Sequence, residues 1–258
     1  MSRLTELHEL VGEARVIRSE SSGLIRGLIE EYRSERNKVS NDIDLSNEGK
    51  ARKLSRISDK YEVKSLRLVE GLNKEYRKSL ETARTKAEEL MIGDLPQVDG
   101  NKKLLFDIRF KELWGRLAFA NNYEDAKNMI REVVKLADEP ALAKEVADQF
   151  VNLSSNAICL LDPSDQMRAR KEIGQLFEDV SRNSKTEDMR QATELHETAS
   201  GLLGSKVVGE IVKGAVVEIS QNTSRYIDNT DEYFSSNAER VQAIELAEGL
   251  HDPTKITG

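Results

Sequence analysis

Histidines are the residues of this sequence best suited to chemistry, and only three are present, His8, His196 and His251. His8 and His196 are each followed by a glutamate, as in the first half of the HExxH motif of zinc proteases. In that motif, a second histidine four residues further on supplies the other zinc ligand from the same helix face. Gly12 and Ser200 occupy that position here, so neither segment predicts a zinc site.

The single cysteine and the one calcium-like segment predict no site either. Cys159 lies in an apolar run, residues 157–161. Such a setting raises the pKa of a thiol and favours an inert, reduced core residue over a nucleophile. Residues 44–49 resemble the start of an EF-hand loop, but Ser55 stands at the twelfth position, where that loop needs a bidentate glutamate. We expect a plain polar loop there.

Known catalytic motifs are also absent from the sequence. It contains no GxxxxGK[ST], GxGxxG or GxSxG pattern, the signatures of P-loop NTPases, Rossmann enzymes and α/β-hydrolases. Neighbouring carboxylates such as Glu30 and Glu31 are typical of the solvated face of a charged helix. We therefore predict no catalytic residue, no cofactor, no metal and no small-molecule substrate. An enzyme without a recognisable signature remains an alternative, and it would require a pocket of converging polar groups.

Composition narrows the class of protein further. The 258 residues include 39 Lys+Arg and 46 Asp+Glu, a net charge of -7, which argues against a nucleic-acid partner. One cysteine cannot form an intramolecular disulfide, so a disulfide-stapled secreted module is excluded. The longest uncharged interior stretch, residues 149–161, is too short for a transmembrane helix of about 20 residues. With no signal-peptide pattern, we expect a soluble cytoplasmic protein.

The elements that would position any functional residue are all helices. Residues 1–95 contain no proline, and their apolar residues follow heptad spacing up to residue 39. Eight of eleven a and d positions are apolar or aromatic, and the exceptions are Arg18, Ser21 and Glu35. The a positions are Leu4, Val11, Arg18, Ile25, Tyr32 and Val39, and the d positions are Leu7, Ala14, Ser21, Leu28 and Glu35.

A second stripe follows over residues 54–90, after a loop near residues 40–50 that is rich in Asn, Asp, Ser and Gly. We therefore predict an antiparallel, coiled-coil-like helical hairpin over residues 1–92. Each arm would be about 57–60 Å long at 1.5 Å per residue. Gly93, Pro96 and Gly100 mark residues 93–100 as a linker.

Residues 101–251 predict a compact bundle of shorter helices, so the fold class is all-α. The only tryptophan, Trp114, and three phenylalanines lie between residues 106 and 119, which favours this helix as the hub of the core. Start signals are Asn122, Pro140, Pro163 and two capping boxes, Ser184 with Glu187 and Ser236 with Glu239. Residues 252–258 are expected to form a flexible tail.

Two C-terminal segments leave alternatives open. Residues 201–219 are rich in glycine and valine, which fits either a membrane-active, switchable segment or a core helix packed closely at Gly209 and Gly214. Glu210 and Glu218 weaken the membrane interpretation. Residues 221–235 place four large apolar or aromatic residues among polar ones. This pattern fits a loop with an aromatic anchor or a contact for a partner.

The general pattern of residues 1–160, including Lys60-Tyr61-Glu62-Val63-Lys64 in the second arm, is similar to scaffold-type and minor structural proteins of tailed bacteriophages. This resemblance implies virion assembly and contacts with other virion proteins, and it assigns no functional residue. We expect a non-enzymatic assembly or interaction protein. Its hairpin would form a homo-oligomer or dock onto protein partners, and the charges at the e and g positions of the heptads would determine which partner is bound. A membrane-interacting protein acting through residues 201–219 is the first alternative.

Overall fold

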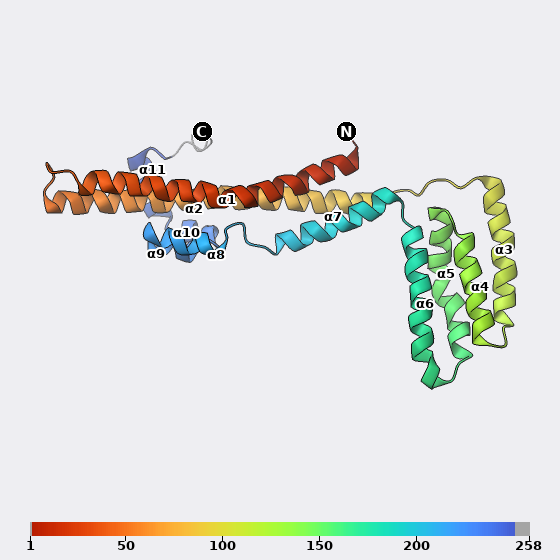
Figure 1. Cartoon of the computed structure of the whole chain (residues 1–258). Helices are drawn as coiled ribbons and strands as arrows, with labels where there is room; N and C mark the ends of the chain where they lie inside the picture. Colours follow the sequence, from red (N-terminus) through yellow and green to blue (C-terminus); the bar gives the residue numbers. More distant parts are fainter. Residues whose placement is uncertain (1, 251–258) are drawn as a thin grey trace. The chain divides into compact units, whose positions relative to one another are not determined.

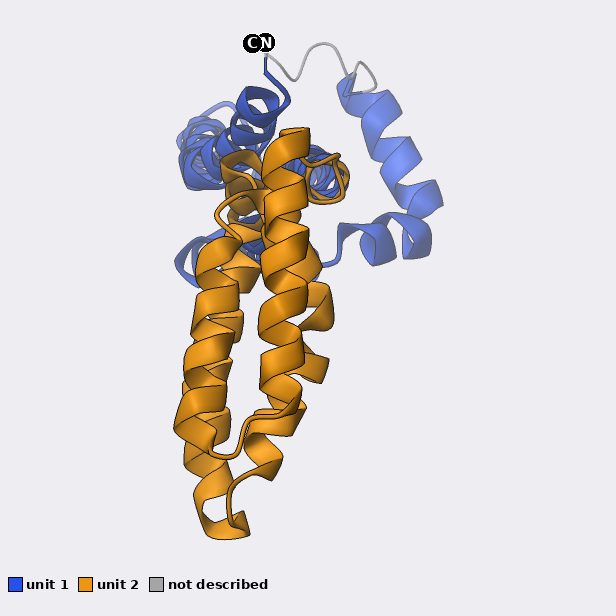
Figure 2. Cartoon of the chain, turned by 90° about the vertical axis from the view of Figure 1, so that its right-hand side faces the viewer, with its two compact units in different colours: residues 1–86, 195–258 blue, residues 87–194 orange. Residues whose placement is uncertain are grey.

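A computed structural model describes residues 2–250 of the chain, and over this range it contains helices and no strand (Figure 1). The predicted all-α class is confirmed. The described residues form two compact units, which are coloured separately in Figure 2. Unit 1 combines residues 1–86 with 195–258, and unit 2 is residues 87–194. The predicted tail, residues 252–258, lies outside the described range.

The expected bundle over residues 101–251 is therefore divided differently in the structure. Residues 195–250 belong with the hairpin and not with the helices that follow residue 100. The physical reason is burial, because the valines of this stretch pack against the hairpin. Val208, Val212 and Val216 share an apolar core with Ile25 and Tyr61.

The hairpin consists of α1 (Arg3–Ser40) and α2 (Asn47–Met91), which pack against each other. The antiparallel pairing is visible in cross-links at successive levels. The Lys86 ammonium binds the Glu6 carboxylate near one end, and Lys64 binds Glu31 at 2.6 Å further along. The connecting loop is shorter than the predicted 40–50, since α2 already begins at residue 47 with the Ser46 hydroxyl accepting from the Gly49 amide.

Most apolar residues at the predicted a and d positions of α1 are buried. The buried ones are Leu7, Val11, Ala14, Ile25, Leu28 and Tyr32. The exception Ser21 is buried as well, with 0% exposure. Its hydroxyl donates to the carbonyl of Val207 at 2.9 Å. The weak middle of the stripe is thus the place where a distant part of the chain packs against α1.

The C-terminal segment, defined here as residues 204–250, follows the end of α7 (Glu187–Leu203). It contains α8 (Glu210–Ala215), the 3-10 turn η1 (Val216–Glu218), α9 (Gln221–Tyr226), α10 (Thr230–Ser236) and α11 (Ala238–Glu248). Residues 201–219 are thus broken into short pieces and do not form one core helix. A Cβ atom on Gly209 or Gly214 would meet no heavy atom within 4 Å, so the predicted close packing there is wrong. Residues 221–235 form α9 and α10, where a loop was one expectation.

Unit 2 contains four complete helices in sequence, α3 (Gly100–Ala118), α4 (Tyr123–Leu136), α5 (Pro140–Cys159) and α6 (Pro163–Asn183). Their shared core draws most of its buried residues from α4 and α5. The expected hub, Trp114, is only partly buried at the edge of that core, and Phe119 is 85% exposed. Only one side of α3 faces the other helices, so its remaining large side chains stay outside.

Local start signals were predicted with mixed success. Asn122 caps α4 by accepting from the amide of Asp125, and the two predicted prolines begin α5 and α6. The capping box at Ser184 is wrong, because that residue ends α6 and Thr186 accepts from the Met189 amide. The box at residue 236 is also wrong, since Asn237 precedes α11 without a side-chain cap.

Candidate functional site

The C-terminal segment covers one part of the hairpin surface, and this contact determines which part remains open. Val208, Val212, Val216 and Ile219 are buried against α1 and α2. In the same segment, Ile211 and Leu246 stay strongly exposed, at 83% and 68%. Most valines and isoleucines of residues 201–219 therefore pack within unit 1. Among the described helices, none combines the length and apolar content needed to cross a membrane.

A buried polar cluster holds the second half of this segment against α2. Glu62 is only 2% exposed, and it accepts hydrogen bonds from the Tyr233 hydroxyl at 2.6 Å and from the Arg240 guanidinium at 2.8 Å. The guanidinium also contacts Asp59 at 2.6 Å. Burial, together with the hydrogen bond to Glu62, raises the pKa of Tyr233 well above its usual value. The phenol therefore stays a neutral donor, and the cluster acts as a clamp.

Further cross-links within unit 1 join α1 to α2 and the hairpin to the C-terminal segment. A second polar cluster lies toward the loop end of the hairpin, where the Glu35 carboxylate accepts from Lys60 at 2.9 Å and from the Tyr61 hydroxyl at 3.0 Å. Burial acts to raise the pKa of Glu35, but these two hydrogen bonds outweigh it and hold the pKa below its ordinary value. Other links between the hairpin and the C-terminal segment include Arg33 to Glu218, Arg67 to Glu245 and Ser58 to the carbonyl of Ile219.

One stretch of the hairpin forms an apolar groove that is open to solvent. The groove has a volume of about 620 Å³ and lies between α1 and α2. Val16 in its wall is 51% exposed. Leu10 and Ile17 also line it, and Leu24 continues their spacing of seven residues with 47% exposure. The complete lining is Leu10, Glu13, Val16, Ile17, Glu75, Lys78, Ser79 and Thr82.

This open stripe was not predicted, although its spacing is present in the sequence. The a and d positions of α1 account for its heptad pattern, and Leu10, Ile17 and Leu24 each lie one position before an a residue. The packed a and d face is used within the hairpin, so a second stripe at the same period is the signal for an additional contact.

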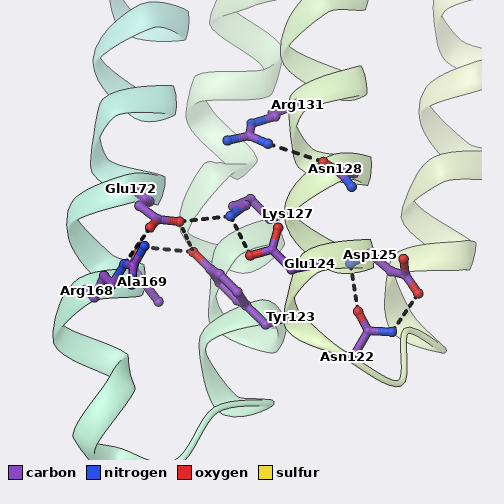
Figure 3. Close-up of polar contacts among 10 residues, drawn as sticks. All are labelled: Asn122, Tyr123, Glu124, Asp125, Lys127, Asn128, Arg131, Arg168, Ala169 and Glu172. Atoms are coloured by element: carbon purple, nitrogen blue, oxygen red, sulfur yellow. Dashed lines mark hydrogen bonds and ion pairs between the residues drawn. The ribbon is translucent and has the colours of Figure 1, made fainter.

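In unit 2, the most connected polar cluster links α4 and α6 (Figure 3). The buried Lys127 ammonium donates to Glu124 at 2.7 Å and to Glu172 at 2.9 Å, and Glu172 also accepts from the Tyr123 hydroxyl and from Arg168. The hydrogen bonds to the two glutamates raise the pKa of Lys127. A lysine that acts as base or nucleophile needs a lowered pKa. This cluster therefore suits a structural cross-link between two helices.

The residues singled out from the sequence do not come together in a site. His8 is on the exposed side of α1, and Asp44 lies in the exposed loop before α2. Cys159 was expected in the core, but it is exposed. It is the last residue of α5, and the buried positions of that helix end with Ala157.

No group of three or more His, Cys, Asp or Glu residues within 2–250 is arranged to hold a metal ion. The open features of the described chain are the groove of the hairpin and the exposed apolar residues of α3. No family model, no curated protein and no solved structure matches this chain.

Proposed function

We propose that this protein is a non-enzymatic assembly protein that associates with a second copy of itself through the hairpin. The observation that carries this proposal is the open groove, because its apolar residues Leu10 and Ile17, continued by Leu24, repeat every seven residues. That period is the one by which a second helical layer packs onto a helix pair. The C-terminal segment leaves this part of the hairpin uncovered.

The charges at the groove support a second copy as the occupant. Glu13 on α1 lies at the level of Ser79 on α2, whose hydroxyl is 3.5 Å from the carboxylate. A two-fold axis parallel to the helices would place α1 of one copy against α2 of the other at the same level. Glu13 would then face Lys78 of the second copy, and the reverse pair would form by symmetry. Lys78 has no ion pair to any residue in the described part of the chain.

The resulting unit would be an antiparallel four-helix assembly with a self-complementary interface. The resemblance of residues 1–160 to scaffold-type and minor structural proteins of tailed bacteriophages suggests virion assembly as its setting. In that setting the homo-oligomer would contact further virion proteins.

Sedimentation velocity of the full chain tests the proposal. We expect a concentration-dependent dimer for the unmodified protein and a monomer for Val16→Glu, which places a charge in the groove. Ile43→Glu is the matched control, because Ile43 is 93% exposed in the loop outside the groove. This control should dimerise like the parent.

A charge exchange identifies the pairing. Glu13→Lys and Lys78→Glu should each weaken the dimer through like-charge contacts, and the double variant should recover it. A parent protein that remains monomeric at every concentration would refute the proposal. Recovery that is absent in the double variant would refute the arrangement of the two copies.

A further inference from the structure

A separate apolar stripe runs along the solvent-exposed side of α3 in unit 2. On α3, Leu104, Leu105 and Ile108 are 59%, 61% and 57% exposed, and Phe119, which directly follows the helix, is 85% exposed. The opposite side of the same helix supplies Phe106, Leu113 and Leu117 to the core of the unit. α3 therefore carries large apolar residues on both sides, and those on the outer side are not covered by the other helices of unit 2.

The spacing of this stripe fits a helix as its occupant. The outer face has its centre at positions 101, 105, 108, 112 and 115 of α3, followed by 119 just beyond the helix, and these positions alternate steps of four and three residues as in a coiled-coil seam. Three of them are large and apolar, namely Leu105, Ile108 and Phe119. Gly115 lies on this line, and a Cβ atom placed there would meet nothing within 4 Å. Open space at a glycine allows the backbone of a partner helix to approach closely.

Charge determines the kind of helix. α3 contains five basic and two acidic residues, whereas unit 2 as a whole contains 15 basic and 21 acidic residues. Arg109 and Arg116 are seven residues apart on one edge of the stripe, and Lys111 is on the other edge. All three are exposed, and none forms an ion pair with another residue of the described chain. Glu112 occupies a central position, where a partner would need a basic or polar residue.

These observations disfavour two other occupants. If a second copy supplied its own α3 in antiparallel orientation, Arg109 would face Arg116 of that copy, and like charges oppose pairing. A lipid surface would bury a broad apolar face, whereas this stripe is narrow and has Glu112 at its centre. Two shallow grooves that share Glu112 and Arg116 lie beside the stripe, between α3 and α4, and could receive side chains of a partner helix.

We propose that the outer face of α3 docks an acidic amphipathic helix of another protein, with carboxylates seven residues apart opposite Arg109 and Arg116. This contact uses residues of unit 2, whereas the hairpin groove lies in unit 1, so each contact can be tested without changing the residues of the other. The partner helix would carry one basic residue opposite Glu112, which would select a single register, as buried polar residues do in coiled coils.

Fluorescence anisotropy with the full chain tests this proposal. The probe is a labelled three-heptad peptide with leucine at the seam positions, glutamate at the flanking positions and one central lysine. A matched peptide carries lysine at the flanking positions. We expect the acidic peptide to bind about tenfold more tightly than the basic one at low salt, and the preference to shrink at high salt.

Two double variants separate the stripe from general charge effects. Arg109→Glu with Arg116→Glu should reverse the preference between the two peptides. Arg170→Glu with Lys171→Glu changes the charge equally at exposed positions on α6 and should leave the preference unchanged. Ile108→Asp should abolish binding of both peptides while circular dichroism shows an intact fold.

Three results would overturn the proposal. They are the absence of saturable binding to the acidic peptide, a preference that survives the Arg109/Arg116 reversal, and binding that survives Ile108→Asp. Vesicles of phosphatidylcholine and phosphatidylglycerol form a further arm. Vesicle binding that is lost in Ile108→Asp, together with no peptide binding, would assign the stripe to a lipid surface instead.

Discussion

The clamp around Glu62 makes a quantitative prediction for Arg240→Met. This change removes the guanidinium but keeps an apolar stem of similar length, so the Glu62 carboxylate remains 2% exposed without its cationic partner. Removing one partner of a buried ion pair costs about 3–5 kcal/mol. Two features reduce this cost, since Tyr233 still donates to Glu62 and the Arg240 side chain is 40% exposed. We expect a loss of about 2–3 kcal/mol in the free energy that holds α11 against α2.

Hydrogen–deuterium exchange of the α11 amides measures this free energy directly. Because about 1.4 kcal/mol corresponds to a factor of ten, exchange in α11 should accelerate by about 30- to 150-fold. Arg52→Met is the control, because Arg52 pairs with Glu48 at a fully solvated position and such pairs contribute about 0–1 kcal/mol. Exchange in α11 should be unchanged in this control.

A second variant isolates the cause. Glu62→Gln combined with Arg240→Met removes both charges, so the double variant should exchange more slowly than Arg240→Met. The reasoning would be refuted by acceleration of less than about threefold in the single variant. It would also be refuted if the double variant exchanged as fast as the single one, because the unpaired charge would then not be the source of the loss.

Three further predictions concern single residues. Because the pKa of Glu35 is lower in the folded state, its ion pair with Lys60 stabilises the hairpin above about pH 4.5, and this stabilisation is lost as the pH falls through the folded pKa. Urea titrations should therefore show that the parent is more stable than Glu35→Gln at neutral pH, and that the difference shrinks in acid. Ser21→Ala leaves the Val207 carbonyl without its donor and should lower the free energy of unfolding by about 1–3 kcal/mol in the same titration. The exposed Cys159 should react with a thiol reagent in the native protein at a rate close to that of the unfolded chain, whereas strong protection would contradict its exposure.

The hairpin could be predicted because its signal is local and repeated. Heptad spacing over residues 4–39 identified Leu7, Val11 and Ile25 as packed residues without knowledge of anything outside the two arms. The same holds for Asn122, whose cap lies three residues from its donor. Signals of this kind act over one or two turns, so composition and spacing are sufficient to read them.

The packing of residues 204–250 could not be predicted in this way. Ser21 meets Val207, and Glu62 meets Tyr233 and Arg240, across separations of 171–186 residues. A serine and a glutamate at such positions look like surface residues in the sequence. Both residues are buried only because residues 204–250 pack over them, and each then needs a hydrogen-bond partner from that segment. These contacts place residues 195–250 with the hairpin. For that reason unit 2 ends at residue 194, whereas the sequence predicted a bundle that continues to residue 251.

Both open surfaces are exposed apolar residues of a helix with charged residues beside them. The arrangement of the charges differs, and we expect different partners for that reason. At the hairpin groove, Glu13 and Lys78 lie together, so a two-fold arrangement satisfies both charges and favours a second copy. On α3, Arg109 and Arg116 repeat one sign along an edge, so self-pairing is disfavoured and an acidic helix is favoured. If both proposals are correct, the chain offers a self-association contact in unit 1 and a contact for another protein in unit 2. Charge reversal at the groove should weaken self-association and leave the peptide preference of α3 unchanged, whereas charge reversal on α3 should change that preference and leave self-association unchanged.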